Sequence, residues 1–227
     1  MDLKGKVFLI TGASRGIGAA TALLAAKEMV KVAVNYKKNL SLAEKIAQEI
    51  SKTGSESLIC QADVSDITQV KSMVQKIIDE WGRIDVLINN AGVLNSGHIL
   101  NLTYEQIEET IDVNIKGLII VTKEVTPHMV GQRDGIIVNI SSGAGKRGHA
   151  DYSVYSATKF AVLGFTQSIA QDLAGHNIRA YAVCPGHVAT DMTGGLGMPP
   201  EKTAKRIIET VKEILNLESG ENTEIYF

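Results

Sequence analysis

The eight residues from Thr11 to Gly18, TGASRGIG, decide the fold of this 227-residue chain. They follow the apolar run 7–10 (VFLI), and a segment of helical period begins directly after them. In this position Gly12 would permit a tight turn, Gly16 would let backbone N–H groups approach a diphosphate, and Gly18 would let a helix pack close to the strand. The N-terminus of that helix would direct unpaired N–H groups at the phosphates. The stretch therefore predicts the first strand, turn and helix of a dinucleotide-binding α/β sheet.

The spacing of these glycines limits the inference. It is G-x-x-x-G-x-G, whereas the general dinucleotide fingerprint is G-x-G-x-x-G. A purely structural strand-to-helix turn therefore stays open as an alternative at this point.

Apolar, β-branched runs alternate with longer segments of helical period along the rest of the chain. Strands are predicted at 7–11, 31–36, 57–61, 86–89, 135–140, 179–183 and 224–227, and helices at 19–27, 40–50, 68–81, 104–126, 153–174 and 201–217. Strands that alternate with helices imply right-handed crossovers and a parallel sheet with helices on both faces. We predict a single-domain Rossmann fold of the α/β class, with a doubly wound seven-stranded parallel sheet formed by residues 1–227.

The composition excludes several classes of protein. Hydrophobic residues make up 44% and charged residues 21%, which is not the composition of a disordered or collagenous chain. The net charge of −2 offers no electrostatic footprint for nucleic acid or an anionic membrane. Cys60, Cys184 and the five histidines show no disulfide framework and no metal-ligand spacing. Without an apolar leader or an 18-residue apolar run, the chain is expected to be soluble and cytoplasmic, with no metal.

The residues after the predicted strand 31–36 bear on the choice of cofactor. An Asp or Glu about 20 residues beyond the glycines usually holds the ribose 2′-hydroxyl. Here Tyr36 is followed by Lys37 and Lys38, with no carboxylate. Lys37, together with Arg15 from the Gly-rich turn, would attract a 2′-phosphate. This pattern predicts NADP(H); the alternative is NAD(H), with the two lysines as a solvated loop pair.

Tyr155 and Lys159, in the stretch YSATK, form a candidate catalytic pair. They lie four residues apart within the predicted helix 153–174 and therefore share one of its faces. A neighbouring ammonium favours phenolate, although lowering the phenol pKa of about 10 by about 3 units takes about 4 kcal/mol. Ser142 follows the predicted strand 135–140 at its carboxyl end, where open α/β sheets bind ligands. Its hydroxyl could hold a carbonyl oxygen while Tyr155 donates a proton.

Taken together, these motifs resemble the short-chain dehydrogenase/reductase family in its single-domain form. The residues that carry the resemblance occur in the family's order and are Thr11–Gly18, Asp63-Val64, Asn89-Asn90-Ala91-Gly92, Asn114, Ser142, Tyr155 with Lys159, and Pro185-Gly186 with Thr190. Within the family, the turn with Arg15 and Lys37 is most similar to 3-oxoacyl-acyl-carrier-protein reductases.

The resemblance implies a role for each matching position. Tyr155 would be the general acid in carbonyl reduction and the base in alcohol oxidation, and Lys159 would lower its pKa and bind the nicotinamide ribose. Ser142 would orient the substrate carbonyl, and Asn114 would hold a water that links Lys159 to solvent. The expected cofactor-binding residues are Gly12, Ser14, Arg15, Gly16, Ile17, Gly18, Tyr36, Lys37, Asp63, Val64, Asn90, Ala91, Gly92, Tyr155, Lys159, Pro185, Gly186, Val188 and Thr190.

The resemblance implies an NADP(H)-dependent oxidoreductase that interconverts a ketone and a secondary alcohol, with 3-oxoacyl thioesters as one substrate class. The alternatives are a dinucleotide-sensing protein without turnover and an NAD-dependent alcohol or sugar dehydrogenase of the same fold. The expected partners are a small carbonyl or alcohol substrate and further copies of the chain, in a homotetramer or homodimer, with no nucleic acid and no membrane. The Gly/Pro-rich stretch 193–200 (TGGLGMPP) is interpreted either as an ordinary loop or as a mobile flap over the pocket.

Overall fold

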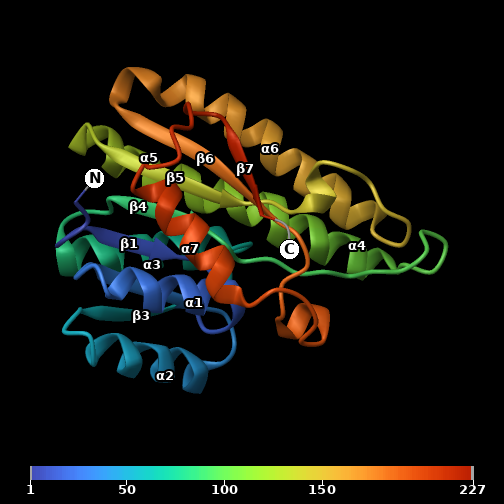
Figure 1. The fold of residues 1–227 in the computed structure, drawn as a ribbon, viewed down its shortest axis with the longest axis horizontal. Coiled ribbons are helices and arrows are strands. Elements are labelled where there is room, and N and C mark those ends of the chain that lie inside the picture. The colour runs from blue at the N-terminus through green and yellow to red at the C-terminus, as the bar shows by residue number, and fades with distance from the viewer. Residues whose placement is uncertain (1, 226–227) are drawn as a thin grey trace.

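Seven strands between residues 2 and 225 form one parallel sheet (Figure 1). The computed structural model describes residues 2–225. Its strands are β1 (Val7–Ile10), β2 (Lys31–Tyr36), β3 (Ser57–Gln61), β4 (Val86–Asn89), β5 (Gly135–Ile140), β6 (Ile178–Pro185) and β7 (Asn222–Ile225). They lie in the order β3-β2-β1-β4-β5-β6-β7, and every neighbouring pair is parallel. The predicted doubly wound fold is confirmed.

Helices cover both faces of this sheet (Figure 1). One face carries α1 (Gly16–Ala26), α2 (Leu40–Ser51) and α7 (Pro200–Val211). The other carries α3 (Ile67–Trp81), α5 (Leu118–Gln132) and α6 (Ser153–Leu173), and α4 (Tyr104–Ile111) packs beside α6.

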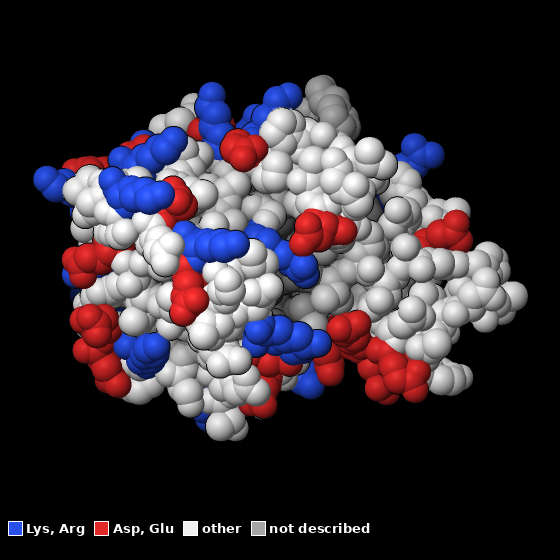
Figure 2. Space-filling model, turned by 90° about the horizontal axis from the view of Figure 1, so that it is seen from below, with Lys and Arg blue, Asp and Glu red and all other residues white. Residues whose placement is uncertain are grey.

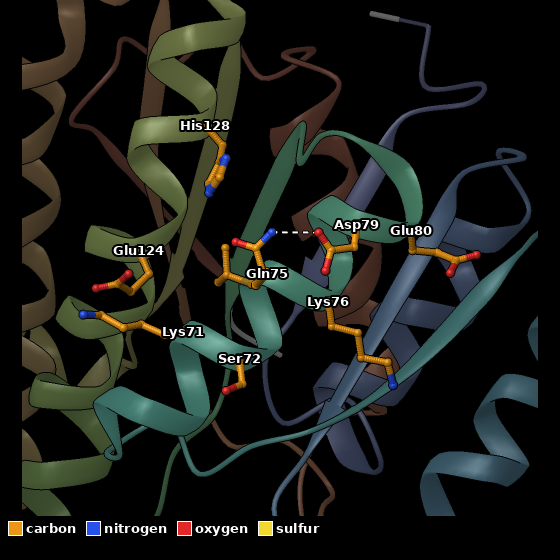
Figure 3. Close-up of a pocket in the computed structure, with 9 residues that line it drawn as sticks. Lys71, Ser72, Gln75, Lys76, Asp79, Glu80, Glu124 and His128 are labelled. Carbon is orange, nitrogen blue, oxygen red and sulfur yellow. Dashed lines mark hydrogen bonds between the residues drawn. The ribbon is translucent and has the colours of Figure 1, made fainter.

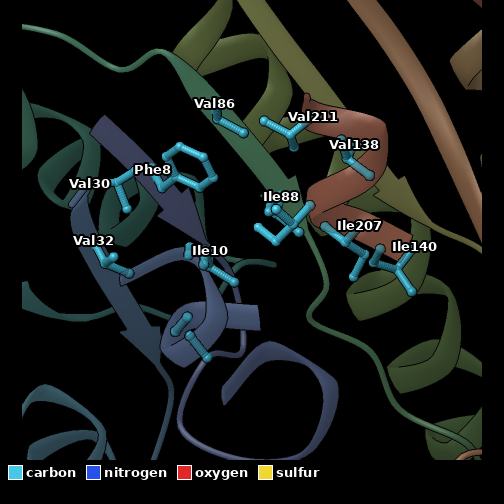
Figure 4. Packing of buried hydrophobic residues seen from close by; sticks show 14 of the residues in the cluster. Phe8, Ile10, Val30, Val32, Val86, Ile88, Val138, Ile140, Ile207 and Val211 are labelled. Atoms are coloured by element: carbon cyan, nitrogen blue, oxygen red, sulfur yellow. The ribbon is translucent and has the colours of Figure 1, made fainter. Parts of the chain in front are cut away.

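Alternating side chains of each strand enter the two cores. In β1, Phe8 and Ile10 join the cluster beneath α1 and α7 (Figure 4), whereas Val7 and Leu9 join the cluster beneath α3 and α5. All four side chains are buried. A strand that is covered on both faces is apolar at consecutive positions, which is why VFLI reads as a continuous apolar run.

The predicted helix 104–126 is wrong in its continuity and in its end. The structure divides it into α4, a π-helical turn at Asp112–Gly117, and α5, which continues through Pro127 to Gln132. A Pro inside a helix removes one N–H bond, to the carbonyl four residues earlier, and here that carbonyl belongs to the exposed Lys123. Water can therefore satisfy the freed carbonyl, and the helix survives.

Several other predicted boundaries also moved; for example, the strand predicted at 7–11 ends at Ile10 and the one predicted at 179–183 spans Ile178–Pro185. The helix predicted at 19–27 begins at Gly16, because the glycines themselves form its first turn. The helix predicted at 201–217 ends at Val211, and Glu213 and Asn216 then take positive φ angles of 58° and 50° that break it. The strand predicted at 224–227 is β7, at Asn222–Ile225, and positions 226–227 lie outside the described residues.

The order of the strands determines where ligands can bind. Because all strands are parallel, their carboxyl ends meet at one edge of the sheet. β1 lies between β2 and β4, so the chain leaves β1 in one direction and later returns to its other side. Ligands of open α/β sheets bind in the crevice at this switch point. The Gly-rich turn after β1 and the segment after β4 both lie there.

At the opposite edge, the buried carboxylate of Asp85 joins β1 to β4. It is 3% exposed, accepts a 2.8 Å hydrogen bond from the backbone N–H of Val7, and forms ion pairs with Lys6 and Arg83. The substitution Asp85→Ala is expected to lower the free energy of unfolding by about 2–3 kcal/mol, because it leaves a buried N–H unpaired, removes the carboxylate that Arg83 bonds and leaves Lys6 with Asp134 alone. Urea unfolding measures this loss.

The control for this prediction is Glu49→Ala in α2. Glu49 also pairs with a cation, Lys52, but both side chains are more than half exposed. Exposed pairs of this kind contribute less than about 1 kcal/mol. Equal losses in the two variants would contradict the role given to Asp85.

Candidate active site

The Gly-rich turn is held by two asparagine side chains from neighbouring strands. Asn35, near the end of β2, accepts a 3.0 Å hydrogen bond from the N–H of Gly12. Asn90, directly after β4, donates to the carbonyls of Thr11 and Gly12 at 2.9 and 3.2 Å. Gly12 has a φ of +62° and Gly16 a φ of +57°, in the left-handed region that favours glycine. The amide of Asn90 is thus engaged with the turn that it flanks.

Close packing behind the turn requires glycine at position 18. A Cβ at this position would lie 2.5 Å from both Asn90 Nδ2 and the carbonyl oxygen of Gly12. Helix α1 then starts with Arg15 as N-cap, whose side chain caps no N–H, and its first turn contains no acidic residue. A helix N-terminus with no side-chain cap and no acidic residue in its first turn is suited to bind an anionic group. The turn therefore fits the phosphates of a dinucleotide.

Each of the two cations predicted to receive a 2′-phosphate is paired with a carboxylate. Lys37 Nζ lies 2.6 Å from Asp63 Oδ2, and Arg15 Nη1 lies 2.8 Å from Asp191 Oδ2. Burial alone would raise the pKa of Asp63, but hydrogen bonds from Lys37 and Ser65 outweigh it and lower that pKa below its usual value. Asp63 and Lys37, predicted as separate contacts, form one unit.

Tyr155, Lys159 and Ser142 come together at the carboxyl end of β5. α6 presents Tyr155 and Lys159 on one face, with Lys159 Nζ 5.6 Å from the centre of the phenol ring. The Lys159 ammonium donates to the carbonyl of Ile140, the last residue of β5, at 2.9 Å. Ser142 lies two residues further on and forms a hydrogen bond with the Tyr155 side chain. These three predicted catalytic residues are therefore in mutual reach.

Ser142, and not its neighbour Ser141, is available for a substrate. The hydroxyl of Ser141 is buried and donates to the carbonyl of Lys159 at 2.8 Å. A Cβ at Gly145 would lie 2.5 Å from this hydroxyl oxygen and 2.6 Å from the same carbonyl, so the packing there tolerates only glycine. Ser141 thus fixes the start of α6 relative to β5, and the geometry favours Ser142 as the substrate contact.

Burial dominates the pKa values of both Tyr155 and Lys159. It raises the pKa of the Tyr155 phenol; the hydrogen bond with Ser142 opposes the shift, and nearby Tyr152 adds to it. It lowers the pKa of Lys159, which is 5% exposed, from 10.5 to about 8. We expected the ammonium to lower the phenol pKa, but the net direction is upward because desolvation disfavours phenolate more strongly. Around pH 7 the phenol therefore keeps its proton and the amine is charged.

Asn114 connects this pair to the segment after β4. It lies in the π-helical turn, where its side chain accepts from the N–H of Val93 at 2.8 Å and donates to the carbonyl of Val93 at 3.0 Å. It also donates to the hydroxyl of Thr158 in α6 at 3.2 Å. A Cβ on Gly92 would lie 3.3 Å from Asn114 Oδ1 and 3.7 Å from Lys159 Nζ. Single π-helical turns are common at functional sites, and this one places a buried amide beside the lysine.

The segment between β6 and α7 lies against the Gly-rich turn. We call residues 186–199 the β6–α7 loop. Thr190 in this loop is so near that a Cβ on Gly16 would meet its methyl group at 3.2 Å. Residues 191–193 form a short 3₁₀ turn, and α7 follows at Pro200. Met192 and Leu196 are exposed on it.

The remaining predicted cofactor residues differ in their exposure to solvent. Ser14, Ile17, Ala91 and Gly186 are half-buried, whereas Val188 is buried. Two more are packed into the cores. Tyr36 belongs to the hydrophobic cluster beneath α1 and α7, and Val64 belongs to the cluster beneath α3 and α5. Pro185 ends β6 and is buried.

Residues that the sequence analysis missed hold this site together. Asn35, a buried amide at the end of an apolar strand, was visible as a break in the run VAV and could have been noticed. Ser141 and Thr158 gave no signal that distinguishes them from other hydroxyl residues. Asp191 could not have been found, because its partner Arg15 lies 176 positions away in the chain.

A groove of about 770 Å³ lies between α3 and α5 (Figure 3). His128 and Glu124 on α5 face Gln75 and Lys71 on α3 across it. No predicted site residue lines it, and its lining mixes cations and carboxylates. It has the character of a solvated surface groove.

Charges of both signs are also mixed on the face of the molecule that is seen from below in Figure 2. Among residues 2–225, no three His, Cys, Asp or Glu side chains are grouped as a metal site would need. None of the helices in this part of the chain is both long and apolar enough to cross a membrane.

Comparison with known proteins gives consistent similarities. A model of the family described as short chain dehydrogenase matches residues 6–199. A 3-oxoacyl-[acyl-carrier-protein] reductase of Synechocystis sp. is 41% identical over 198 residues, which cover 87% of this chain and 80% of the relative. A reductase of the same name from Thermotoga maritima is 40% identical over 223 residues, covering 93% of this chain and 84% of the relative.

A solved structure is similar over nearly its full length. It is a short chain dehydrogenase from Burkholderia cenocepacia J2315 in complex with NADP. The TM-score is 0.91 at 30% sequence identity, and the match covers 99% of this chain and 98% of that one.

Proposed function

The chain belongs to the short-chain dehydrogenase family and is an oxidoreductase, and from this premise we propose that it interconverts a ketone and a secondary alcohol with NADP(H). The observation that carries the proposal is the cluster of Tyr155, Lys159 and Ser142 beside the Gly-rich turn, with Lys159 Nζ 5.6 Å from the Tyr155 ring centre. A dinucleotide-sensing protein would not require a proton donor at this position.

NADP(H) suits the donors of the cleft. The Gly-rich turn and the N-terminus of α1 would bind the diphosphate, and Arg15 and Lys37 would bind the 2′-phosphate. Asp63 and the segment 90–92 would contact the adenosine part, and residues 185–190 would lie along the nicotinamide. When bound, the cofactor supplies or accepts the hydride. The similar Burkholderia cenocepacia structure, in complex with NADP, supports this assignment.

Tyr155 is the proton donor in the proposed reduction. Ser142 hydrogen-bonds the substrate carbonyl oxygen and holds it beside the phenol. As the carbonyl carbon gains a hydride, this oxygen takes the Tyr155 proton and becomes the hydroxyl of the alcohol. Because burial raises the pKa of Tyr155, the acid form is present throughout the neutral pH range. Lys159 stabilises the phenolate that remains, and alcohol oxidation reverses these steps.

Asn114 is proposed to support the return of a proton to Tyr155. Its side chain donates both N–H bonds, to Val93 and Thr158, and accepts one from Val93, so that Oδ1 keeps one lone pair for a water. These bonds fix the segment after β4 and the second turn of α6 around the lysine amine. A water held beside this amide would connect Lys159 with solvent. Asn114 is thus a positioning residue in the proposed relay.

The proposed substrate class is 3-oxoacyl thioesters. Relatives at 40–41% identity carry the name of 3-oxoacyl-[acyl-carrier-protein] reductase. The exposed Met192 and Leu196 of the β6–α7 loop offer apolar contacts for an acyl chain. Exposed apolar side chains on α4, α5 and α6, namely Ile111, Ile119 and Phe160, support the proposed assembly into a homo-oligomer.

The test is a substrate panel with both cofactors. Acetoacetyl-coenzyme A, simple ketones and sugar ketones are assayed with NADPH and NADH at equal concentration, following nicotinamide absorbance. We expect kcat/KM to be highest for the thioester, and higher with NADPH than with NADH. Turnover of simple ketones alone would contradict the substrate class, preference for NADH would contradict the cofactor, and binding of NADPH without turnover of any substrate would favour a sensing protein.

A further inference from the structure

The ion pair between Arg15 and Asp191 joins the Gly-rich turn to the β6–α7 loop. Arg15 is the N-cap residue of α1, and Asp191 begins the 3₁₀ turn of the loop. The two side chains are 67% and 72% exposed, and the N–O distance is 2.8 Å. Arg15 is also one of the two cations assigned to the 2′-phosphate. The carboxylate therefore stands at a position where a phosphate is expected.

The loop holds this carboxylate in place through its own hydrogen bonds. The hydroxyl of Thr193 donates to the carbonyl of Val188 at 2.6 Å, and the N–H of Thr190 donates to that hydroxyl at 3.1 Å. At the base of the loop, Ala189 and Met198 are joined by a backbone hydrogen bond of 2.9 Å. Asp191 is therefore presented to Arg15 by a folded turn, and it remains nearby when Arg15 takes another partner.

Because both cations are paired with carboxylates, the local net charge disfavours the binding of a phosphate. Lys37 is paired with Asp63 in the same way as Arg15 is paired with Asp191, so these four groups together carry no net charge. An ion pair as exposed as Arg15–Asp191 contributes little to stability and exchanges readily. A 2′-phosphate that binds Arg15 must nevertheless lie close to the Asp191 carboxylate, and like charges at such distances repel. NAD(H) has a hydroxyl instead of this phosphate and avoids the repulsion.

We propose that Asp191 is a specificity-determining residue, whose carboxylate competes with the 2′-phosphate of NADP(H) for Arg15 and reduces discrimination between NADP(H) and NAD(H). The inference rests on the proposed binding of NADP(H). The β6–α7 loop would then have two roles: Met192 and Leu196 contact the substrate, and Asp191 affects the choice of cofactor.

The test is the substitution Asp191→Asn in the full chain. The dissociation constants of NADPH and NADH are measured from the increase in nicotinamide fluorescence on binding, at low and at high salt. We expect the Kd of NADPH to fall about three- to tenfold and the Kd of NADH to change less than about twofold. The NADPH effect is expected to shrink at about 0.5 M salt, where exposed charges are screened.

Two further variants show whether the effect passes through Arg15. Asp191→Glu keeps the carboxylate and is expected to bind NADPH like the parent chain. In an Arg15→Ala background, Asp191→Asn is expected to change NADPH affinity by about twofold or less, because the competition is gone.

The inference is overturned if Asp191→Asn leaves NADPH affinity unchanged or weakens it, or if it changes the affinities for NADPH and NADH by the same factor. A parent chain that binds neither dinucleotide contradicts the proposed function itself. A parent chain that binds NADPH, with discrimination unaltered in Asp191→Asn, contradicts only the role of Asp191.

Discussion

The substitution Tyr155→Phe is expected to lower kcat for carbonyl reduction by about 10³-fold, because it removes the only proton donor assigned to the substrate oxygen. The ring remains, so the edge-on contact with Tyr152 at 6.3 Å and the contact with the Lys159 ammonium are retained. NADPH affinity is therefore expected to stay within about threefold of the parent value. Steady-state kinetics and a fluorescence titration of NADPH measure the two quantities.

The neighbouring Tyr152 provides a matched control. It is the N-cap residue of α6, and its ring packs against that of Tyr155. Tyr152→Phe loses the same hydroxyl group three positions earlier and is expected to retain kcat within about threefold. If Tyr155→Phe kept comparable turnover, the assignment of the proton donor would be refuted; if Tyr152→Phe lost as much, Tyr152 would share that role.

The substitution Lys159→Met is expected to lower kcat by about 10²–10⁴-fold, because the phenolate of Tyr155 loses the nearby cation that stabilises it. The same substitution is expected to raise the free energy of unfolding at neutral pH. The ammonium is buried with one 2.9 Å hydrogen bond to Ile140, and burial lowers its pKa to about 8. The charged lysine thus destabilises the folded chain, and methionine removes that charge.

The pH dependence of stability separates this effect from general damage. Between the folded pKa of about 8 and the unfolded value near 10.5, the unfolded chain binds more protons at Lys159 than the folded chain. Its contribution to stability therefore rises with pH across this window and is lowest below pH 8. The stability advantage of Lys159→Met over the parent is expected to decrease by about 2–3 kcal/mol between pH 7 and pH 10.5.

Urea unfolding at several pH values measures this difference. Lys123→Met, at an exposed position on α5, is the control, and its difference from the parent is expected to be independent of pH. A difference for Lys159→Met that is equally flat with pH would show that the amine titrates normally. Parental turnover in Lys159→Met would remove the lysine from the mechanism.

The strands were predictable because their signal is local. Four of them, β2 to β5, have the predicted bounds, since a buried parallel strand is a continuous β-branched run that ends at polar or turn residues. The helix between 104 and 132 was predictable in type only. Residues of its π-helical turn make distant contacts: Asn114 bonds Val93, 21 positions away, and Gly117 packs against Val64. Neither contact leaves a pattern in the sequence.

The site was predictable where its geometry is that of one element. Tyr155 and Lys159 share a face because a helix repeats every 3.6 residues, and the Gly-rich turn follows from the residues between β1 and α1. The net direction of the phenol pKa, which burial raises, could not be predicted from the spacing of Tyr155 and Lys159. Spacing shows which groups are neighbours, whereas the pKa depends on how much water the whole fold removes from them.

The sequence by itself determined the alternation of strands and helices, the Gly-rich turn and the pairing of Tyr155 with Lys159, because each depends on residues within about one helical turn or one strand of each other. Only the tertiary structure decided that Asn35 and Asn90 hold the turn, and that Asp63 and Asp191 pair with the two cations beside it. These contacts join segments that meet only because parallel strands bring their carboxyl ends to one edge of the sheet. The energy of each such pairing depends on the distance between the two groups and on their burial. Neither quantity can be obtained from the residues that are neighbours in the sequence.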